Sequence, residues 1–150
     1  YEPTKAARSI TEFVCDDLSN WYVRLNRKRF WEGQLNEDKK TAYDVLYSCL
    51  ITVSKLMAPI APFYAEYLYR SLQWDGSSVH VQDFPVCDSN FVNKDLERRM
   101  ALAQQVTSLV HSIRKNNNLR VRLPLQKISI PVIDTRTKTD LEAVSDLILS

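Results

Sequence analysis

Apolar residues recur every three or four positions over most of the chain, the spacing that places them on one face of an α-helix. The pattern predicts four helices, over residues 4–31, 37–57, 62–72 and 93–117. Gly33 follows the first, Asn36 is a suitable cap for the second, and Pro62 suits the first turn of the third. Asparagine tolerates the left-handed backbone of helix ends, so the triplet at 116–118 is expected to end the fourth.

Beyond residue 118 the helical period gives way to alternation of apolar and polar residues, at 119–123 and again at 127–132. Alternation is typical of a half-buried strand, so one or two strands are expected here. Residues 140–150 then have the pattern of another helix. The expected fold is therefore mainly α: a helical bundle over residues 1–117, followed by a small C-terminal α+β unit over residues 118–150.

Only two glycines occur among the 150 residues, Gly33 and Gly76. So few glycines favour helices with short connections over an all-β fold with many tight turns. Glycine-rich phosphate loops need several glycines close together, so neither a P-loop nor a dinucleotide-binding turn is expected.

Other common functional sites also lack their sequence signals. The three cysteines are widely spaced, with no C-x-x-C pair and no histidine cluster, so no metal site is expected. Neither His80 nor His111 has a nucleophile or carboxylate partner in an evident motif, so no catalytic residues are predicted. No stretch approaches the ~20 apolar residues of a membrane span. Unpaired cysteines fit a reducing, cytoplasmic location.

Residues 20–31 combine four basic and four aromatic side chains in twelve positions, with no acidic residue among them. At helical spacing, one narrow stripe of this run carries an amide, two guanidiniums and an indole: Asn20, Arg24, Arg27 and Trp31. These four residues form the basic stripe. Guanidiniums hold phosphates or base edges and an indole offers a stacking face, so the stripe is predicted to bind a single-stranded nucleic acid.

Charge is also segregated further along the chain, where residues 98–133 contain seven basic residues and no acid. A local positive field attracts an anionic partner, most commonly a nucleic acid. Two other interpretations stay open. The basic stripe can be a solvated helix face with Trp31 packed against a neighbouring helix. Alternatively, the chain can be a helical protein–protein interaction module whose basic face meets an acidic partner.

Four segments, at 18–31, 56–66, 78–85 and 113–125, carry more specific motifs. The most discriminating begins Leu18-Ser19-Asn20-Trp21-Tyr22-Val23-Arg24. In residues, order and spacing, the four segments resemble the anticodon-binding domain of class I isoleucyl-tRNA synthetases. The resemblance covers most of the chain, about residues 7–125.

The resemblance implies a helical bundle that reads the anticodon arm of isoleucine tRNA. The parent enzyme joins isoleucine to this tRNA with ATP, so its catalytic domain is expected upstream, and this stretch is expected to hold no cofactor and to catalyse nothing itself. The family's bundle also normally begins with a helix that this chain lacks. The predicted tRNA-binding residues are the basic stripe, with Arg29, Arg120 and Arg122 as further candidates.

A bundle without one helix is expected to expose an apolar groove beside Leu46, Leu50, Val53 and Leu56. Large exposed apolar surfaces tend to become interfaces, most simply two-fold ones. We therefore expect the isolated chain to self-associate, or to melt below a version extended upstream by one helix. Light scattering measures self-association, and thermal melts compare the melting temperatures of the two proteins. A monomer that melts at the same temperature as the extended version would contradict the expectation.

Overall fold

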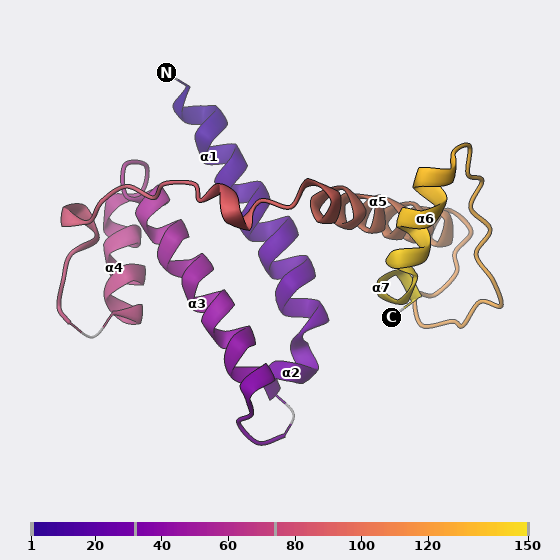
Figure 1. The fold of residues 1–150 in the computed structure, drawn as a ribbon, viewed down its shortest axis with the longest axis horizontal. Helices are drawn as coiled ribbons and strands as arrows, with labels where there is room; N and C mark the ends of the chain where they lie inside the picture. Colours follow the sequence, from indigo (N-terminus) through magenta and orange to yellow (C-terminus); the bar gives the residue numbers. More distant parts are fainter. Residues whose placement is uncertain (1, 32, 74, 150) are drawn as a thin grey trace. The chain divides into compact units, whose positions relative to one another are not determined.

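The computed structural model describes residues 2–31, 33–73 and 75–149, and most of them are helical (Figure 1). Tyr1, Glu32, Trp74 and Ser150 lie outside the described residues. The expectation of a mainly α fold is confirmed. In chain order the elements are α1 (Pro3–Glu12), the π-helix η1 (Phe13–Val23), α2 (Arg27–Trp31), α3 (Glu37–Met57), α4 (Pro62–Leu72), the 3-10 turns η2 (Val79–Val81) and η3 (Ser89–Phe91), α5 (Lys94–Asn116), α6 (Thr135–Ala143) and α7 (Ser145–Leu149).

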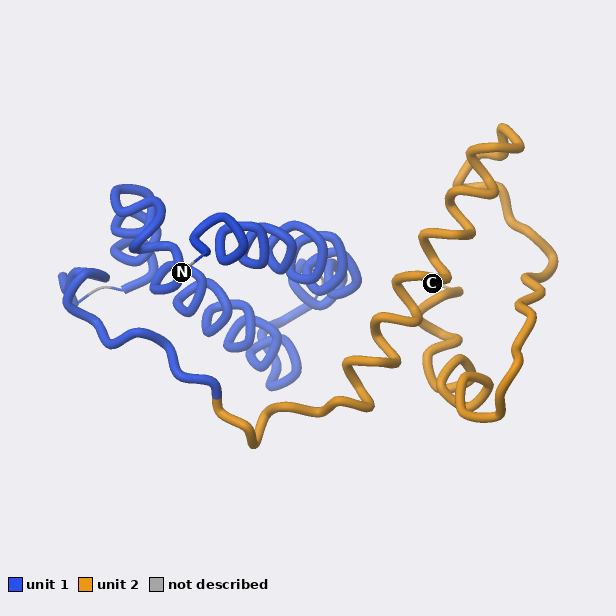
Figure 2. The backbone as a smooth tube through the Cα atoms, turned by 90° about the horizontal axis from the view of Figure 1, so that it is seen from above, with its two compact units in different colours: residues 1–87 blue, residues 88–150 orange. Residues whose placement is uncertain are grey.

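The chain packs as two compact units, residues 1–87 and residues 88–150 (Figure 2). Helices α1 to α4 belong to the first unit, and α5 to α7 belong to the second. The domain boundary expected between residues 117 and 118 falls within the second unit. It stays a prediction, because packing within one chain does not by itself define a domain.

In the first unit, α3 lies between the helices α1 and α2 on one side and α4 on the other (Figure 1). Asn36 fixes the start of α3, since its side-chain carbonyl accepts the backbone N–H of Lys39 at 2.7 Å. Two acids in the first turn, Glu37 and Asp38, suit the positive end of the helix dipole. The predicted limits of α3 and α4 are confirmed, and those of α5 are confirmed to within one residue at each end.

The first predicted helix is not one continuous α-helix. The structure has α1, then the π-helix η1, and a break at Asn26 before α2. In a π-helix each backbone bond spans five residues in place of four. Apolar spacing reports which face is buried and not which carbonyl accepts each N–H, so it does not distinguish the two forms. At the break, the backbone N–H and the side-chain amide of Asn26 both donate to the Tyr22 carbonyl, at 3.1 and 2.8 Å.

An aromatic cluster attaches α2 to α3. Phe30 is 7% exposed and packs edge-on against Tyr22 and Tyr43, with ring centroids 6.2 and 5.1 Å away. The Tyr22 hydroxyl donates to the Ala42 carbonyl at 3.0 Å, and the Tyr43 hydroxyl donates to the Phe30 carbonyl at 3.1 Å. Burial raises the pKa of Tyr22 above its ordinary value. These contacts fix how α2 is rotated against α3.

A carboxylate holds the turn η2 against α4. Glu66 accepts hydrogen bonds from the Ser78 hydroxyl and from the Val79 backbone N–H, both at 2.9 Å. Val79 is thereby buried against two residues of α4, Ala65 and Tyr69. The hydrogen bonds from Val79 and Ser78 and the charge of Arg70 outweigh the cost of partial burial, so the pKa of Glu66 is lowered.

The strands predicted over residues 119–123 and 127–132 are a misprediction, because no residue that the structure describes is in a strand. The β part of the expected C-terminal α+β unit is therefore corrected to irregular chain. In a strand, the carbonyls of Arg120 and Leu123 would lie roughly 10 Å apart. Both instead bond to the same nitrogen of Arg114, at 2.9 Å each. Alternation of residue types indicates two different faces, but it does not provide a neighbouring strand to pair with.

The helix expected over residues 140–150 is found as α6 and α7, and α6 begins earlier, with Asp134 as its cap. One carboxylate holds α6 on α5. Asp140 is 4% exposed and accepts hydrogen bonds from the Nε atoms of Arg98 and Arg99, at 2.9 and 3.0 Å. These two guanidiniums hold the pKa of Asp140 below its ordinary value.

We predict that Asp140→Asn destabilises the packing of α6 on α5 at neutral pH and has little effect in acid. A carboxylate whose pKa is lowered on folding stabilises the folded state above its ordinary pKa, and this stabilisation is lost as the pH falls through the lowered value. The asparagine of the variant is uncharged at every pH. The difference in stability between the variant and the unaltered protein should therefore shrink below about pH 4. Hydrogen exchange of the α6 amides against pH measures it. A difference that persists unchanged into acid would show that the charge of Asp140 is not what holds α6.

Candidate nucleic-acid interface

Trp31 and Arg27 lie next to each other on α2, and both side chains are exposed. The Cζ atom of Arg27 lies 5.8 Å from the centroid of the Trp31 ring, within the range of a cation–π contact. Trp31 is 72% exposed, so its indole is not packed against a neighbouring helix. The interpretation in which this ring is a structural contact is therefore not what the structure shows. An exposed indole beside a guanidinium offers a stacking face and a positive charge together.

The other two members of the basic stripe are exposed but are not brought into contact with this pair. Arg24 and Asn20 are both exposed, and no ion pair joins Arg24 or Arg27 to a carboxylate among the described residues. Asn20 lies in η1, where the π-helical backbone does not keep the spacing of about 100° per residue on which the stripe was predicted. The placement of Asn20 in line with Arg24 therefore stays a prediction.

Arg29 forms a cross-link within the protein. Its Nε and Nη2 atoms donate to the two carboxylate oxygens of Asp38 at 2.8 and 2.6 Å, a bidentate pair. Its Nη1 atom donates to the side-chain carbonyl of Asn26 at 2.7 Å. The hydrogen bonds from Arg29 hold the pKa of Asp38 below its ordinary value. The side chain thus ties α2 to the first turn of α3 and supports the orientation of the basic stripe.

The remaining candidates, Arg120 and Arg122, lie in the second unit and are both exposed. Among the described residues, neither guanidinium has an ion-pair partner. The backbone that carries them curls around Arg114, whose Nη1 atom donates to the carbonyls of Arg120, Val121 and Leu123 at 2.9, 3.1 and 2.9 Å. Sequence reasoning missed this role of Arg114, because nothing in its spacing separates it from the other basic residues nearby.

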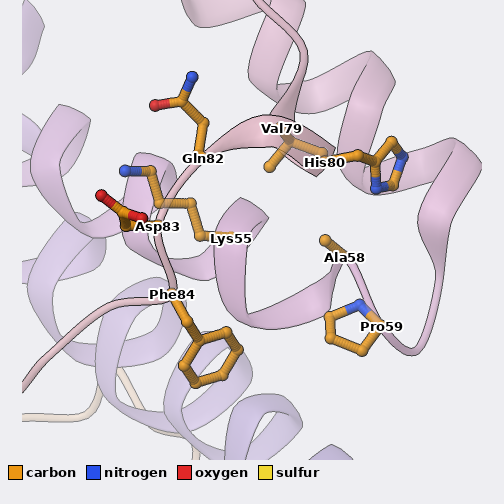
Figure 3. A pocket seen from close by; sticks show the side chains of 8 residues that line it. All are labelled: Lys55, Ala58, Pro59, Val79, His80, Gln82, Asp83 and Phe84. Carbon is orange, nitrogen blue, oxygen red and sulfur yellow. The ribbon is translucent and has the colours of Figure 1, made fainter.

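A hollow of about 240 Å³ lies in the first unit between the end of α3 and the turn η2 (Figure 3). Lys55 and Asp83 both line it, so an amine and a carboxylate offset each other there. Figure 3 shows the His80 ring turned away from these two side chains. This mixture of charges does not select an anion. The lining residues are Lys55, Ala58, Pro59, Val79, His80, Gln82, Asp83 and Phe84.

Within the part of the chain that the structure describes, no three His, Cys, Asp or Glu side chains are grouped as ligands of a metal ion. The described helices include none that is both long and apolar enough to cross a membrane. The three cysteines are free thiols, and burial raises the pKa of Cys49. The chemistry that the described residues do offer is cationic and aromatic.

Comparison with known proteins agrees with this chemistry. The chain matches the family described as the anticodon-binding domain of tRNA ligase over residues 1–129. It is similar to the isoleucine–tRNA ligases of Cytophaga hutchinsonii (55% identical over 153 residues), Bacteroides thetaiotaomicron (53% over 155 residues) and Porphyromonas gingivalis (53% over 150 residues). These alignments cover 99–100% of the chain but only 13–14% of each relative.

The chain therefore spans about one seventh of the length of these relatives. The family match includes both the basic stripe and the segment that carries Arg120 and Arg122. From a match over residues 1–129, on a helical fold with an exposed basic and aromatic helix face, it follows that this chain belongs to the anticodon-binding domains of tRNA ligases.

Proposed function

We propose that this chain is the part of an isoleucine–tRNA ligase that binds the anticodon arm of isoleucine tRNA. The observation that carries the proposal is the exposed pair of Arg27 and Trp31, in a chain whose family binds anticodons. The relatives at 53–55% identity, all named isoleucine–tRNA ligases, support isoleucine as the amino acid.

In this proposal the indole of Trp31 stacks on an unpaired base of the anticodon loop, as aromatic side chains do with single-stranded RNA. The Arg27 guanidinium over the ring restricts its rotation and adds positive charge at the stacking site. Arg24 is proposed to meet a phosphate, because it is exposed and has no ion-pair partner in the described part of the chain. The Phe30 cluster and the Arg29–Asp38 pair hold the helix that carries them.

We further propose that the longer protein joins isoleucine to its tRNA with ATP in the cytoplasm, and that this domain works beside the rest of that protein. The chain has only two, widely separated glycines, which supports an ATP site elsewhere in the longer protein. The role proposed for the domain is to position the tRNA, which lowers the KM for tRNA without entering the chemical step.

We predict that Arg24→Ala, Arg27→Ala and Trp31→Ala each weaken binding of the isoleucine anticodon arm. A stacked base is worth ~1–3 kcal/mol, so the loss for Trp31→Ala should be about fivefold to about 150-fold. In the full-length protein, aminoacylation should fall while isoleucine-dependent pyrophosphate exchange stays unchanged, because only the first reaction needs tRNA. Equilibrium binding to an anticodon-arm hairpin and the two enzyme assays measure this.

Arg8→Ala is the control, since it removes one exposed positive charge from the same unit but lies in α1, outside the basic stripe. It should cost less affinity than Arg27→Ala. A salt titration separates the proposal from binding of an acidic protein, because contacts with RNA phosphates make log K fall linearly with log salt. If the three variants charge tRNA as well as the unaltered protein does, the basic stripe is not the interface.

A further inference from the structure

The helix α5 ends in a way that turns the chain back over its last residues. Asn118 adopts a left-handed backbone conformation with φ of 53°. The Leu119 N–H donates to the Arg114 carbonyl at 2.8 Å, and the Asn118 N–H donates to the Lys115 carbonyl at 3.1 Å. This pair of bonds is a Schellman motif with asparagine in place of the usual glycine. It directs residues 119–123 back past the side chain of Arg114.

Arg114 then holds the returning chain with its side chain as well. The Nη1 atom of Arg114 lies 2.9 to 3.1 Å from three carbonyl oxygens, those of Arg120, Val121 and Leu123, so its two N–H groups donate to all three with one N–H shared. The Leu123 N–H closes the turn onto the Arg120 carbonyl at 3.0 Å. A charged donor makes stronger hydrogen bonds than a neutral one, so the shape of this turn depends on Arg114.

Arg120 and Arg122 are the two basic side chains of this turn. Arg120 and Arg122 are exposed, and the described residues provide neither guanidinium with a carboxylate. Other arginines of the unit are engaged: Arg98 and Arg99 pair with Asp140. The stretch around Arg120 and Arg122 contains no acid and no aromatic residue. Such a site suits phosphates better than base edges.

We propose that Arg114 is a positioning residue, which shapes the turn at residues 120–123 so that Arg120 and Arg122 bind phosphates of the tRNA. This inference rests on the proposed function and adds a second RNA-binding surface to it. The surface is independent of sequence, because phosphate contacts carry no base information. The role proposed for Arg114 is to hold the turn, since its Nη1 atom donates to the protein backbone.

A double-mutant cycle in the full-length protein tests the proposal. The variants are Arg114→Ala, the pair Arg120→Ala with Arg122→Ala, and all three together. The probes are a hairpin RNA with the isoleucine anticodon-arm sequence and the same hairpin with a scrambled loop. The pair should weaken binding of both hairpins by the same factor, on the order of tenfold, and lower the salt slope by about one for each lost contact.

Arg114→Ala should reproduce most of this loss, and the triple variant should bind no more weakly than the pair. Hydrogen exchange of the peptide over residues 119–123 should accelerate several-fold in Arg114→Ala. Lys115→Ala removes the same charge one residue further along α5, and its ammonium makes no hydrogen bond to the turn. As the matched control, it should leave that exchange rate unchanged. If Arg114→Ala disturbs the fold, as seen by circular dichroism, the same cycle is run with Arg114→Lys.

Three results would overturn the inference. Additive losses in the triple variant would make Arg114 a direct phosphate contact. If Arg114→Ala binds the hairpins as well as the unaltered protein does, while the Arg120→Ala, Arg122→Ala variant binds them more weakly, the turn does not need Arg114. Unaltered binding by the pair, while Trp31→Ala still weakens binding, would remove the second surface and leave the proposed function standing. If the unaltered protein binds neither hairpin, the proposed function fails as well.

Discussion

The burial of Phe30 between Tyr22 and Tyr43 is the contact on which the exposed arginine and tryptophan of the first unit depend. A helix of five residues is too short to be stable alone, so the orientation of α2 comes from what it packs against. Because Phe30 points into the cluster, the neighbouring face of the same helix turn faces solvent. Arg27 and Trp31 are on that face, and their exposure is the geometric consequence of one buried ring.

Arginine has two different uses in this chain, and the difference is set by tertiary partners. Arg29 gives its donors to Asp38 and Asn26, and Arg114 gives three hydrogen bonds to backbone carbonyls. Such residues fix the positions of elements. The structure gives Arg24 and Arg122 no such partner among the residues it describes, and both side chains are exposed. A guanidinium with its planar fork of donors suits both uses, so engaged and exposed arginines occur within the same segments.

This division limits what the sequence can predict. Asn36, Pro62 and Asn118 each act on the backbone next to them, so the ends of the long helices follow from local residues. The exposed position of Trp31 also agrees with the predicted stripe. The ion pair of Arg29 cannot be predicted from neighbouring residues, because its partner Asp38 is nine residues away, across the connection between two helices.

The misprediction of strands has the same physical origin. Val121 and Leu123 alternate with arginines as in a strand, but a strand exists only through hydrogen bonds to a neighbour. Here the carbonyls that would form such bonds are taken by Arg114. The π-helix η1 is not predicted, because the spacing of apolar residues does not show which carbonyl accepts each N–H and so does not distinguish a π-helix from an α-helix.

Salt should act differently on the two kinds of arginine. In the proposed complex the exposed guanidiniums would meet RNA at the solvent boundary, where binding releases counterions and is weakened steeply by added salt. The pairs that hold the fold are screened less where they are buried, as at Asp140, which is only 4% exposed. The Arg29–Asp38 pair is more exposed, but the apolar Phe30 cluster also holds α2 on α3. The burial of that cluster does not depend on charge. Under the proposed function, added salt should therefore release RNA over a range of ionic strength in which both units keep their structure.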